Sequence, residues 1–257
     1  MRSTQRDGEQ ESVLERGVSL LWAFDADRPE LGISELSRRT GLPKSTAHRL
    51  TGELVRLGLL EQVGPRLRLG IRLFELGQLV PRRRTLRDAA LPFMEDLREA
   101  TRNSVHLAVL EGIEVVYVEI LLSRGSRSLP SRVGGRLPAH ATGVGKAILA
   151  FSPPEVVAAR IEAGLTRLSP HTIVTPGGLS RELRTIRSEG VSYDRQESDL
   201  GIVCAAAPVI AADGTVTAGL SVTGRAERLD VKRMAPAVRT AALALSRALA
   251  SSGPHRG

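Results

Sequence analysis

Cysteine is almost absent from this sequence, because Cys204 is the only one among 257 residues. A single cysteine excludes an internal disulfide framework and a zinc site built from several cysteines, and it is typical of proteins of the reducing cytoplasm. We therefore expect a cytoplasmic protein. The N-terminus lacks the apolar core of a signal peptide, and no hydrophobic run approaches the length that spans a bilayer.

The sequence also lacks the patterns of enzymes. No acid–histidine pattern, phosphate-binding loop or metal-ligand spacing accompanies Cys204 and His140, the pair that a nucleophilic enzyme would use. Cys204 lies in an apolar run, where most cysteines are inert core residues. His106 and His171 are interpreted as structural. We expect no catalysis, no metal and no cofactor.

The length and composition indicate two domains in a basic protein. At 257 residues and 42% hydrophobic content, the chain can fill two modest cores, and its formal net charge is +8. The charge is concentrated, because eight arginines and lysines but only two glutamates lie between Arg38 and Arg72. A patch of this kind attracts a polyanion such as DNA.

Residues 33–54 predict two short helices joined by a tight turn. Gly41 can take the positive φ that ends a helix, and Pro43 suits the start of the next one. Ala47, Leu50 and Leu54 recur at helical spacing and predict a buried face. Hydroxyl and cationic side chains gather toward the other face, as in a helix that enters a DNA major groove. The alternative is an ordinary helical corner with a solvated charged face.

The segment that follows favours the DNA-binding interpretation. Leu67 and Leu69 alternate with Arg66 and Arg68 after the dipeptide Gly64-Pro65, which predicts a small hairpin. A structural hairpin needs the leucines but not the arginines. After a recognition helix, such a hairpin is a wing whose arginines reach phosphates or a minor groove.

Flanking segments set the expected domain boundaries. Residues 1–10 are expected to form a flexible tail, and a helix with an apolar stripe over 13–24 supports the two helices that follow. We assign residues 11–70 to the winged helix-turn-helix domain, 71–102 to linker helices and 103–251 to an effector-binding domain.

From residue 104 the pattern changes to strands mixed with helices. Alternating apolar residues predict paired strands near 105–109 and 115–122, and Asp213-Gly214 predicts a hairpin between the strands 201–210 and 216–223. Helices are expected in the later part of 139–151, from Pro153-Pro154-Glu155 onward, over 179–188 and over 231–250. Antiparallel strands with helices on one face indicate an α+β domain.

Residues 139–151 begin loosely and become an apolar helix. Thr142 is a good N-cap, and the amide groups of Gly143, Val144 and Gly145 at the helix start attract an anion such as a carboxylate. Alternatively, the glycines only let the helix pack tightly on the sheet. Lys146 is interpreted as covering the helix surface.

The chain resembles the IclR-type transcriptional regulators in three separate motifs. These are Gly41–Leu50, Leu137–Ala147 and Gly201–Val209, the last followed by Gly219–Gly224. The resemblance covers about residues 11–250 and implies a winged helix-turn-helix domain, linker helices and a GAF/PAS-like α+β ligand-binding domain. It also implies a homodimer or dimer of dimers. The tip Gly64-Pro65 is shorter than usual for the family, which leaves contact of the wing with the minor groove open.

The resemblance and the local chemistry together assign candidate site residues. The expected DNA-binding residues are Arg38, Lys44, Ser45, Thr46, His48, Arg49, Arg66 and Arg68. Ile202 and Cys204 share a strand face, as do Ser221 and Thr223, whose hydroxyls can orient a ligand. The expected effector-binding residues are Leu129, Gly143, Val144, Asp194, Ile202, Cys204, Ser221 and Thr223.

The sequence therefore predicts a regulator, more often a repressor in this family, that binds a double-stranded DNA operator and a small effector resembling an organic acid or other carboxylate. Two other classes stay open. One is a DNA-architectural protein with little base preference, and the other is a ligand-processing enzyme with an accessory winged helix.

Overall fold

A computed structural model describes residues 11–25, 27–123 and 131–251, and these divide into two compact units, Met1–Pro81 and Arg82–Gly257. The expected tail 1–10 and Leu129 lie outside the described residues. Each unit has its own buried core. No helix of the described residues is both long and apolar enough to cross a membrane.

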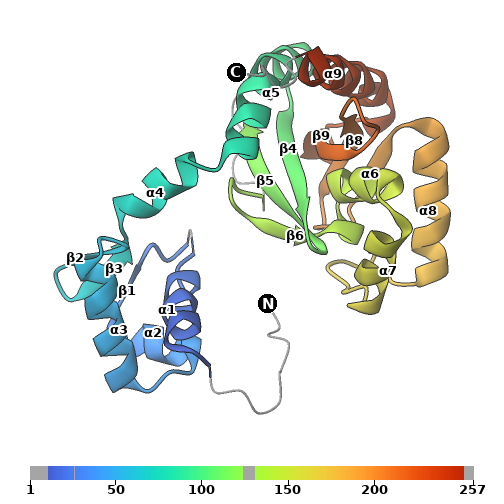
Figure 1. Cartoon of the computed structure of the whole chain (residues 1–257). Coiled ribbons are helices and arrows are strands. Elements are labelled where there is room, and N and C mark those ends of the chain that lie inside the picture. Colours follow the sequence, from blue (N-terminus) through green and yellow to red (C-terminus); the bar gives the residue numbers. More distant parts are fainter. Residues whose placement is uncertain (1–10, 26, 124–130, 252–257) are drawn as a thin grey trace. The chain divides into compact units, whose positions relative to one another are not determined.

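The first unit is a winged helix-turn-helix. It contains α1 (Val13–Trp22), α2 (Ile33–Thr40), α3 (Lys44–Arg56) and α4 (Ile71–Gln78), together with a three-stranded sheet of order β1-β3-β2 (Figure 1). The strands are β1 (Glu30–Leu31), β2 (Leu60–Val63) and β3 (Arg66–Leu69). The expected wing is β2 and β3. The short strand β1, which pairs with β3, was not predicted because two residues carry no periodicity.

The turn of the helix-turn-helix follows from its residue types. Gly41 ends α2 with a left-handed backbone, φ 72° and ψ 1°. Pro43 is the N-cap of α3, just before the helix rather than within its first turn. Ala47, Leu50 and Leu54 are buried in the core of the first unit, as their spacing predicts.

Two apolar patterns of the first unit are buried only in part. Leu20 of α1 and Phe24 just beyond it are buried, but Leu14 of the predicted stripe is 76% exposed, and Trp22 at the end of α1 is 63% exposed. In β3 Leu67 is buried, whereas Leu69 is 44% exposed. Part of the apolar surface of α1 and β3 is therefore not buried within the first unit itself.

The second unit is built on a six-stranded antiparallel sheet of order β6-β5-β4-β9-β8-β7. Its strands are β4 (Ser104–Glu111), β5 (Glu114–Leu121), β6 (Arg136–Pro138), β7 (Ser192–Arg195), β8 (Ile202–Ile210) and β9 (Val216–Arg225). The edge strands β6 and β7 are additions to the sequence prediction, since both are short and half polar. The predicted hairpin at Asp213-Gly214 joins β8 and β9.

Helices cover both faces of this sheet, which corrects the expectation of helices on one face (Figure 1). One core lies between the sheet and the helices α5 (Pro81–Thr101) and α9 (Val231–Ser251). The other lies against α6 (Gly143–Phe151), α7 (Pro154–Glu162) and α8 (Pro176–Glu189), with the 3₁₀ turn η1 (Ala139–Ala141) before α6. The faces differ because alternate residues of each strand point to opposite sides.

The structure places α5 in the second unit. Leu86, Met94 and Leu97 are buried in the core between the sheet, α5 and α9. The segment 71–102, expected as a pair of linker helices, thus contains one helix, α4, with no buried residue and one helix that belongs to the core of the second unit.

Candidate functional site

The first candidate site is the N-terminal half of α3. Its buried face fixes the helix against the core of the first unit, so the opposite face is held outward. Lys44, Ser45, His48 and Arg49 are exposed, and Thr46 is half-buried. None of these side chains forms a hydrogen bond or an ion pair with another described residue. Unpaired donors and cations on a rigid helix are available for base edges and phosphates.

The backbone of α3 adds to this surface. The first bond of the helix runs from the Ala47 N–H to the Pro43 carbonyl, and no side chain caps the helix start. The preceding amide groups therefore carry the partial positive charge of a helix N-terminus, which favours a phosphate.

The predicted DNA-binding arginines outside α3 are exposed but partly engaged. Arg68 forms an ion pair with Glu61, 2.7 Å between Nη2 and Oε2, and Arg66 donates to the Glu30 carbonyl at 3.1 Å. The Arg38 side chain is 75% exposed and lies 3.9 Å from a Glu35 carboxylate oxygen. Exposed ion pairs contribute only about 0–1 kcal/mol, so these arginines can exchange their partners for phosphate.

The second candidate site is a cavity in the second unit, beside the sheet. Its lining residues are His106, Tyr117, Ser131, Leu137, Thr142, Gly143, Val144, Asp194, Ser198, Ile202, Cys204, Ser221 and Thr223. The structure thus brings together every predicted effector residue that it describes. His106, Tyr117, Thr142 and Ser198 were not predicted as ligand residues, because nothing local in the sequence points them toward this place.

Strand register explains how distant residues meet on the cavity floor. Asp194 of β7 lies opposite Cys204 of β8, which lies opposite Thr223 of β9. In the neighbouring row, His106 of β4 lies opposite Ser221 of β9. Directly paired residues project from the same face of a sheet, so these five side chains share one surface.

The N-terminus of α6 borders the same cavity. Thr142 is its N-cap and its Oγ1 accepts a hydrogen bond from the Gly145 N–H at 3.0 Å, so that amide is not free as the sequence suggested. The Gly143 N–H donates to the Cys204 sulfur, and Val144 keeps its N–H group without an oxygen acceptor among the described residues. A Cβ at Gly143 would lie 2.3 Å from the Cys204 sulfur, so only glycine allows this close approach.

Burial controls the titration of the groups in the cavity. It raises the pKa of Asp194 to about 6, against the opposing hydrogen bonds from the Ser198 hydroxyl and the Glu197 N–H. It lowers the pKa of His106 to about 4 and raises that of the Cys204 thiol to about 12. At neutral pH the imidazole is therefore uncharged and the thiol is protonated. Cys204 has the environment of a small wall residue.

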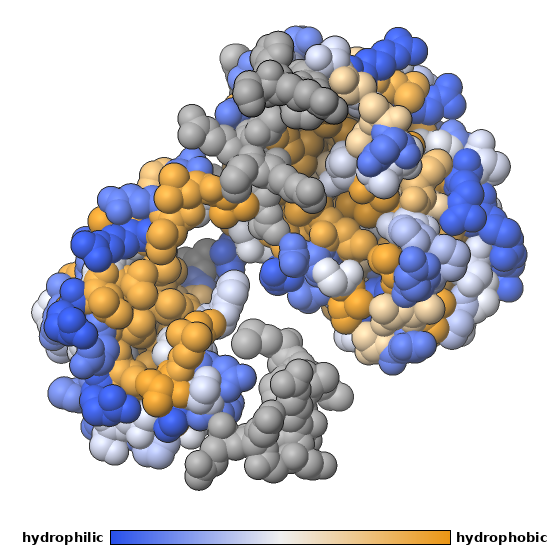
Figure 2. Space-filling model, viewed as in Figure 1, coloured by the Kyte–Doolittle hydropathy of each residue, from blue (hydrophilic) through white to orange (hydrophobic). Residues whose placement is uncertain are grey.

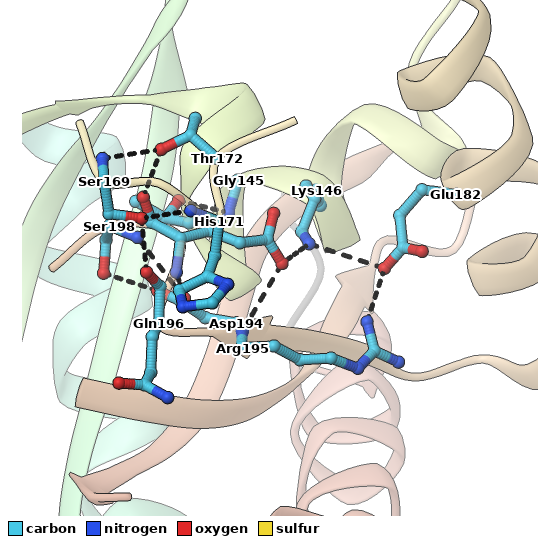
Figure 3. Close-up of polar contacts among 12 residues, drawn as sticks. Gly145, Lys146, Ser169, His171, Thr172, Glu182, Asp194, Arg195, Gln196 and Ser198 are labelled. Atoms are coloured by element: carbon cyan, nitrogen blue, oxygen red, sulfur yellow. Dashed lines mark hydrogen bonds and ion pairs between the residues drawn. The ribbon is translucent and has the colours of Figure 1, made fainter. Parts of the chain in front are cut away.

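A buried ion cluster adjoins the cavity and corrects the interpretation of Lys146. Its side chain is 0% exposed and pairs with Glu197, while Nζ lies 3.4 Å from Glu182 Oε1. Arg195 lies 3.2 Å from the same Glu182 oxygen (Figure 3). The sequence held one signal, since a lysine inside an otherwise apolar helix needs a partner when buried.

The cluster is connected to the cavity through Asp194. Asp194 Oδ1 accepts the Glu197 N–H at 2.6 Å, and Oδ2 accepts the Ser198 hydroxyl. Glu197 is thus held at its backbone by a cavity residue and at its carboxylate by Lys146 of α6. The described residues contain no group of three or more His, Cys, Asp or Glu side chains that could hold a metal ion.

Comparison with known proteins gives this arrangement a family. Residues 13–64 match the IclR helix-turn-helix domain, and residues 78–247 match the family described as bacterial transcriptional regulator IclR C-terminal. The HTH-type transcriptional regulator XynR of Escherichia coli (strain K12) is 33% identical over 242 residues, covering 92% of this chain and 96% of that protein. The transcriptional repressor IclR of the same strain is 30% identical over 226 residues, covering 86% and 82%.

A solved structure supports the same family assignment. An IclR homologue from Microbacterium hydrocarbonoxydans, complexed with 4-hydroxybenzoate, has a TM-score of 0.86 at 35% identity and covers 94% of this chain and 100% of that one. These relatives are named as a transcriptional regulator, a transcriptional repressor and an IclR homologue. Regulation of transcription is a non-enzymatic role. The chain therefore belongs to the IclR family of bacterial transcriptional regulators.

Proposed function

We propose that α3 is the recognition helix of this regulator, with Ser45, Thr46, His48 and Arg49 facing base edges in the major groove. Lys44 contacts phosphate beside the helix, and Arg38, Arg66 and Arg68 contact phosphates from α2 and the wing. The observation that carries this proposal is the exposed, unpaired polar face of α3 opposite the buried residues Ala47, Leu50 and Leu54. A dimer reads a partly palindromic operator through two such helices.

The test is DNA binding to an operator selected from a randomised duplex library. Arg49→Ala should weaken binding by about 5- to 150-fold, equivalent to about 1–3 kcal/mol, and relax the base preference. Arg68→Ala should weaken binding evenly across sequences and reduce the salt slope by about 1. Arg98→Ala, in α5, is the control. Parental binding by both Arg49→Ala and Arg68→Ala at several salt concentrations would exclude this surface.

We propose that the cavity binds a small carboxylate effector that releases the operator, so that the protein acts as a repressor. The helix N-terminus at Gly143 and Val144 suits a carboxylate, which would replace the Cys204 sulfur as the acceptor of the Gly143 N–H, and the hydroxyls of Ser221 and Thr223 orient it. The relative from Microbacterium hydrocarbonoxydans is complexed with an organic acid, 4-hydroxybenzoate. The cavity holds about 20 Å³, room for about one water molecule, so wall side chains must move to admit such an acid.

Effector response is measurable without knowledge of the operator's sequence in the genome. Ser221→Val/Thr223→Val should abolish release of the selected operator by an organic acid found in a thermal-shift screen, with DNA affinity unchanged. Coupling between the two ligands is expected to be about 1–3 kcal/mol. An unchanged response in the double variant would reject this cavity.

We propose that the first unit dimerises through the apolar faces of α1 and α4, giving a homodimer or a dimer of dimers. Leu14 and Trp22 of α1, Ile71 and Phe74 of α4, and Leu79 at the C-cap of α4 are all more than half exposed. Figure 2 shows hydrophobic residues gathered over α4. Exposed apolar patches of this kind mark interfaces. Leu14→Glu or Phe74→Glu should give a monomer in analytical ultracentrifugation. The proposed place of action is the cytoplasm, on nucleoid DNA.

A further inference from the structure

The strand β5 contains a bulge that turns two nearby side chains to opposite faces of the sheet. Residues two apart in a regular strand project from the same face. The register of β5 shifts between Tyr117 and Glu119, which pair with two consecutive residues of β4, so Val118 is the extra residue of the bulge. Tyr117 therefore lines the cavity, whereas Glu119 reaches α5 on the other face.

Glu119 is a buried carboxylate that pairs with a cation of α5. The residue is 8% exposed. Its Oε2 accepts a hydrogen bond from Arg87 Nε at 2.5 Å, and its Oε1 accepts the Ile120 N–H at 2.9 Å. Carboxylates are almost never buried without a partner, so the Arg87 guanidinium allows Glu119 to lie there. The ion pair therefore joins the bulge to α5.

The helix α5 is the first element of the second unit. The first unit ends at Pro81, where α5 begins, and only two residues separate α5 from α4. Arg87 lies in the second turn of α5, directly after Leu86, which is buried in the core between the sheet and the helices α5 and α9. A displacement of this end of α5 therefore acts through a short connection on the unit that contains the helix-turn-helix.

The wall of the cavity must move when an acid binds. The cavity of about 20 Å³ has room for about one water molecule. Tyr117 is part of the wall, and its ring stands edge-on to that of His106, with centroids 5.5 Å apart. A bulge interrupts the hydrogen-bond ladder, so β5 can shift there with less loss than in a regular strand. Movement of Tyr117 therefore also displaces Glu119, two residues along the chain, and its partner on α5.

We propose that the Arg87–Glu119 ion pair couples the cavity to α5, and through α5 to the DNA-binding unit. This inference rests on the proposed effector cavity. Neither side chain lines that cavity, so both are positioning residues. Coupling between two binding sites is reciprocal. Operator binding must therefore change the surroundings of Tyr117, just as an effector changes the affinity for the operator.

The experiment is fluorine NMR of the full chain labelled with 3-fluorotyrosine. The chain has two tyrosines, Tyr117 and Tyr193, so Tyr193→Phe assigns both resonances. Saturation with the operator duplex selected above should shift the Tyr117 resonance of the parent protein. Arg87→Met should lose most of this shift, because the link to α5 is removed. Arg87→Lys keeps a cation and should retain part of the shift.

Two further variants control for stability. Arg98→Met removes a cation of the same helix that pairs with the adjacent Glu99 rather than with the sheet, and it should keep the parental shift. Arg87→Met leaves the Glu119 carboxylate buried without its partner, so Arg87→Met/Glu119→Gln provides the measurement if the single variant does not fold. Circular dichroism establishes folding, and fluorescence anisotropy of the labelled duplex establishes that each variant is saturated.

The outcomes separate this inference from the proposed function. A Tyr117 resonance that operator leaves unchanged in the parent, or a full shift in a folded variant without the ion pair, would overturn the coupling. Operator release by an organic acid that persists in Ser221→Val/Thr223→Val would reject the proposed cavity. A Tyr117 shift that still depends on Arg87 would even then support the link between β5 and the DNA-binding unit, because this measurement uses no effector.

Discussion

Lys146 of α6 and Glu197, two residues beyond β7, form an ion pair whose side chains are only 0% and 4% exposed. The pair joins the helix whose N-terminus borders the cavity to the segment that positions Asp194. Breaking a buried pair from one side leaves an uncompensated charge, which is far more destabilising than losing the attraction itself.

Lys146→Met should therefore lower the free energy of unfolding by about 3–5 kcal/mol. Lys146→Met/Glu197→Gln should recover part of that loss, since the buried Glu197 charge is then no longer stranded, while Glu182 keeps Arg195 as its partner. Urea denaturation of the full chain measures both. Arg136→Met, at an ion pair with Glu114 whose side chains are each 39% exposed, is the control and should change stability by at most about 1 kcal/mol. A double variant no more stable than the single one would contradict this account.

Gly41 and Gly52 should respond to alanine with opposite signs. Nothing lies within 4 Å of a Cβ at either position, so only the backbone differs. Gly41 has φ +72°, which strains any side chain, and Gly41→Ala should destabilise by about 1 kcal/mol. Gly52 lies within the helix α3, and Gly52→Ala should stabilise by about 0.5–1 kcal/mol. Thermal unfolding of the two variants side by side checks the signs.

Gly143→Ala should be destabilising because of one neighbour. The added methyl would lie 2.3 Å from the Cys204 sulfur, and the next heavy atom is the Asp194 nitrogen at 3.3 Å. Cys204→Ala removes the first contact, so Gly143→Ala should cost less in that background. A double-mutant cycle by urea denaturation should give a coupling of about 0.5–3 kcal/mol. Strict additivity would show that the backbone of α6, not the sulfur, opposes the methyl.

Asp194 and His106 should give opposite slopes in the dependence of stability on pH. Folding raises the pKa of Asp194 from 3.8 to about 6, so the folded chain holds more protons between these values and stability falls as pH rises. Folding lowers the pKa of His106 from 6.5 to about 4, so here the unfolded chain holds more protons and stability rises with pH.

The two slopes nearly cancel between about pH 4 and 6 in the parent protein. Relative to the parent, Asp194→Asn should gain stability as pH rises through this window, and His106→Gln should lose it. Urea unfolding at several pH values, taken as the difference from the parent, removes the contributions of other groups. Parallel curves for parent and variants would show that neither group is perturbed.

Many structural features of this molecule can be predicted from local sequence patterns. The spacing of Ala47, Leu50 and Leu54 predicts the buried face of α3, and Gly41 predicts the turn before it, because both depend only on near neighbours. Asp213-Gly214 likewise predicts the hairpin of β8 and β9. Three family motifs in their order supply the domain architecture.

Other features depend on residues far apart in the chain. The strands β1, β6 and β7 are too short to show a period and exist only through their partners. The exposed side chains Leu14 and Trp22 have the same local pattern as buried ones, since amphipathic spacing does not say what covers a face.

The sequence by itself determined the two-domain order, the polar face of α3 and the residue types of the proposed effector cavity, because periodicity, turn chemistry and motif order are properties of neighbours along the chain. Only the tertiary structure decided that Lys146 is buried against Glu197 and that His106 reaches the cavity with a free nitrogen. Both facts depend on strand register and on packing between elements more than 50 residues apart, which one-dimensional spacing does not encode.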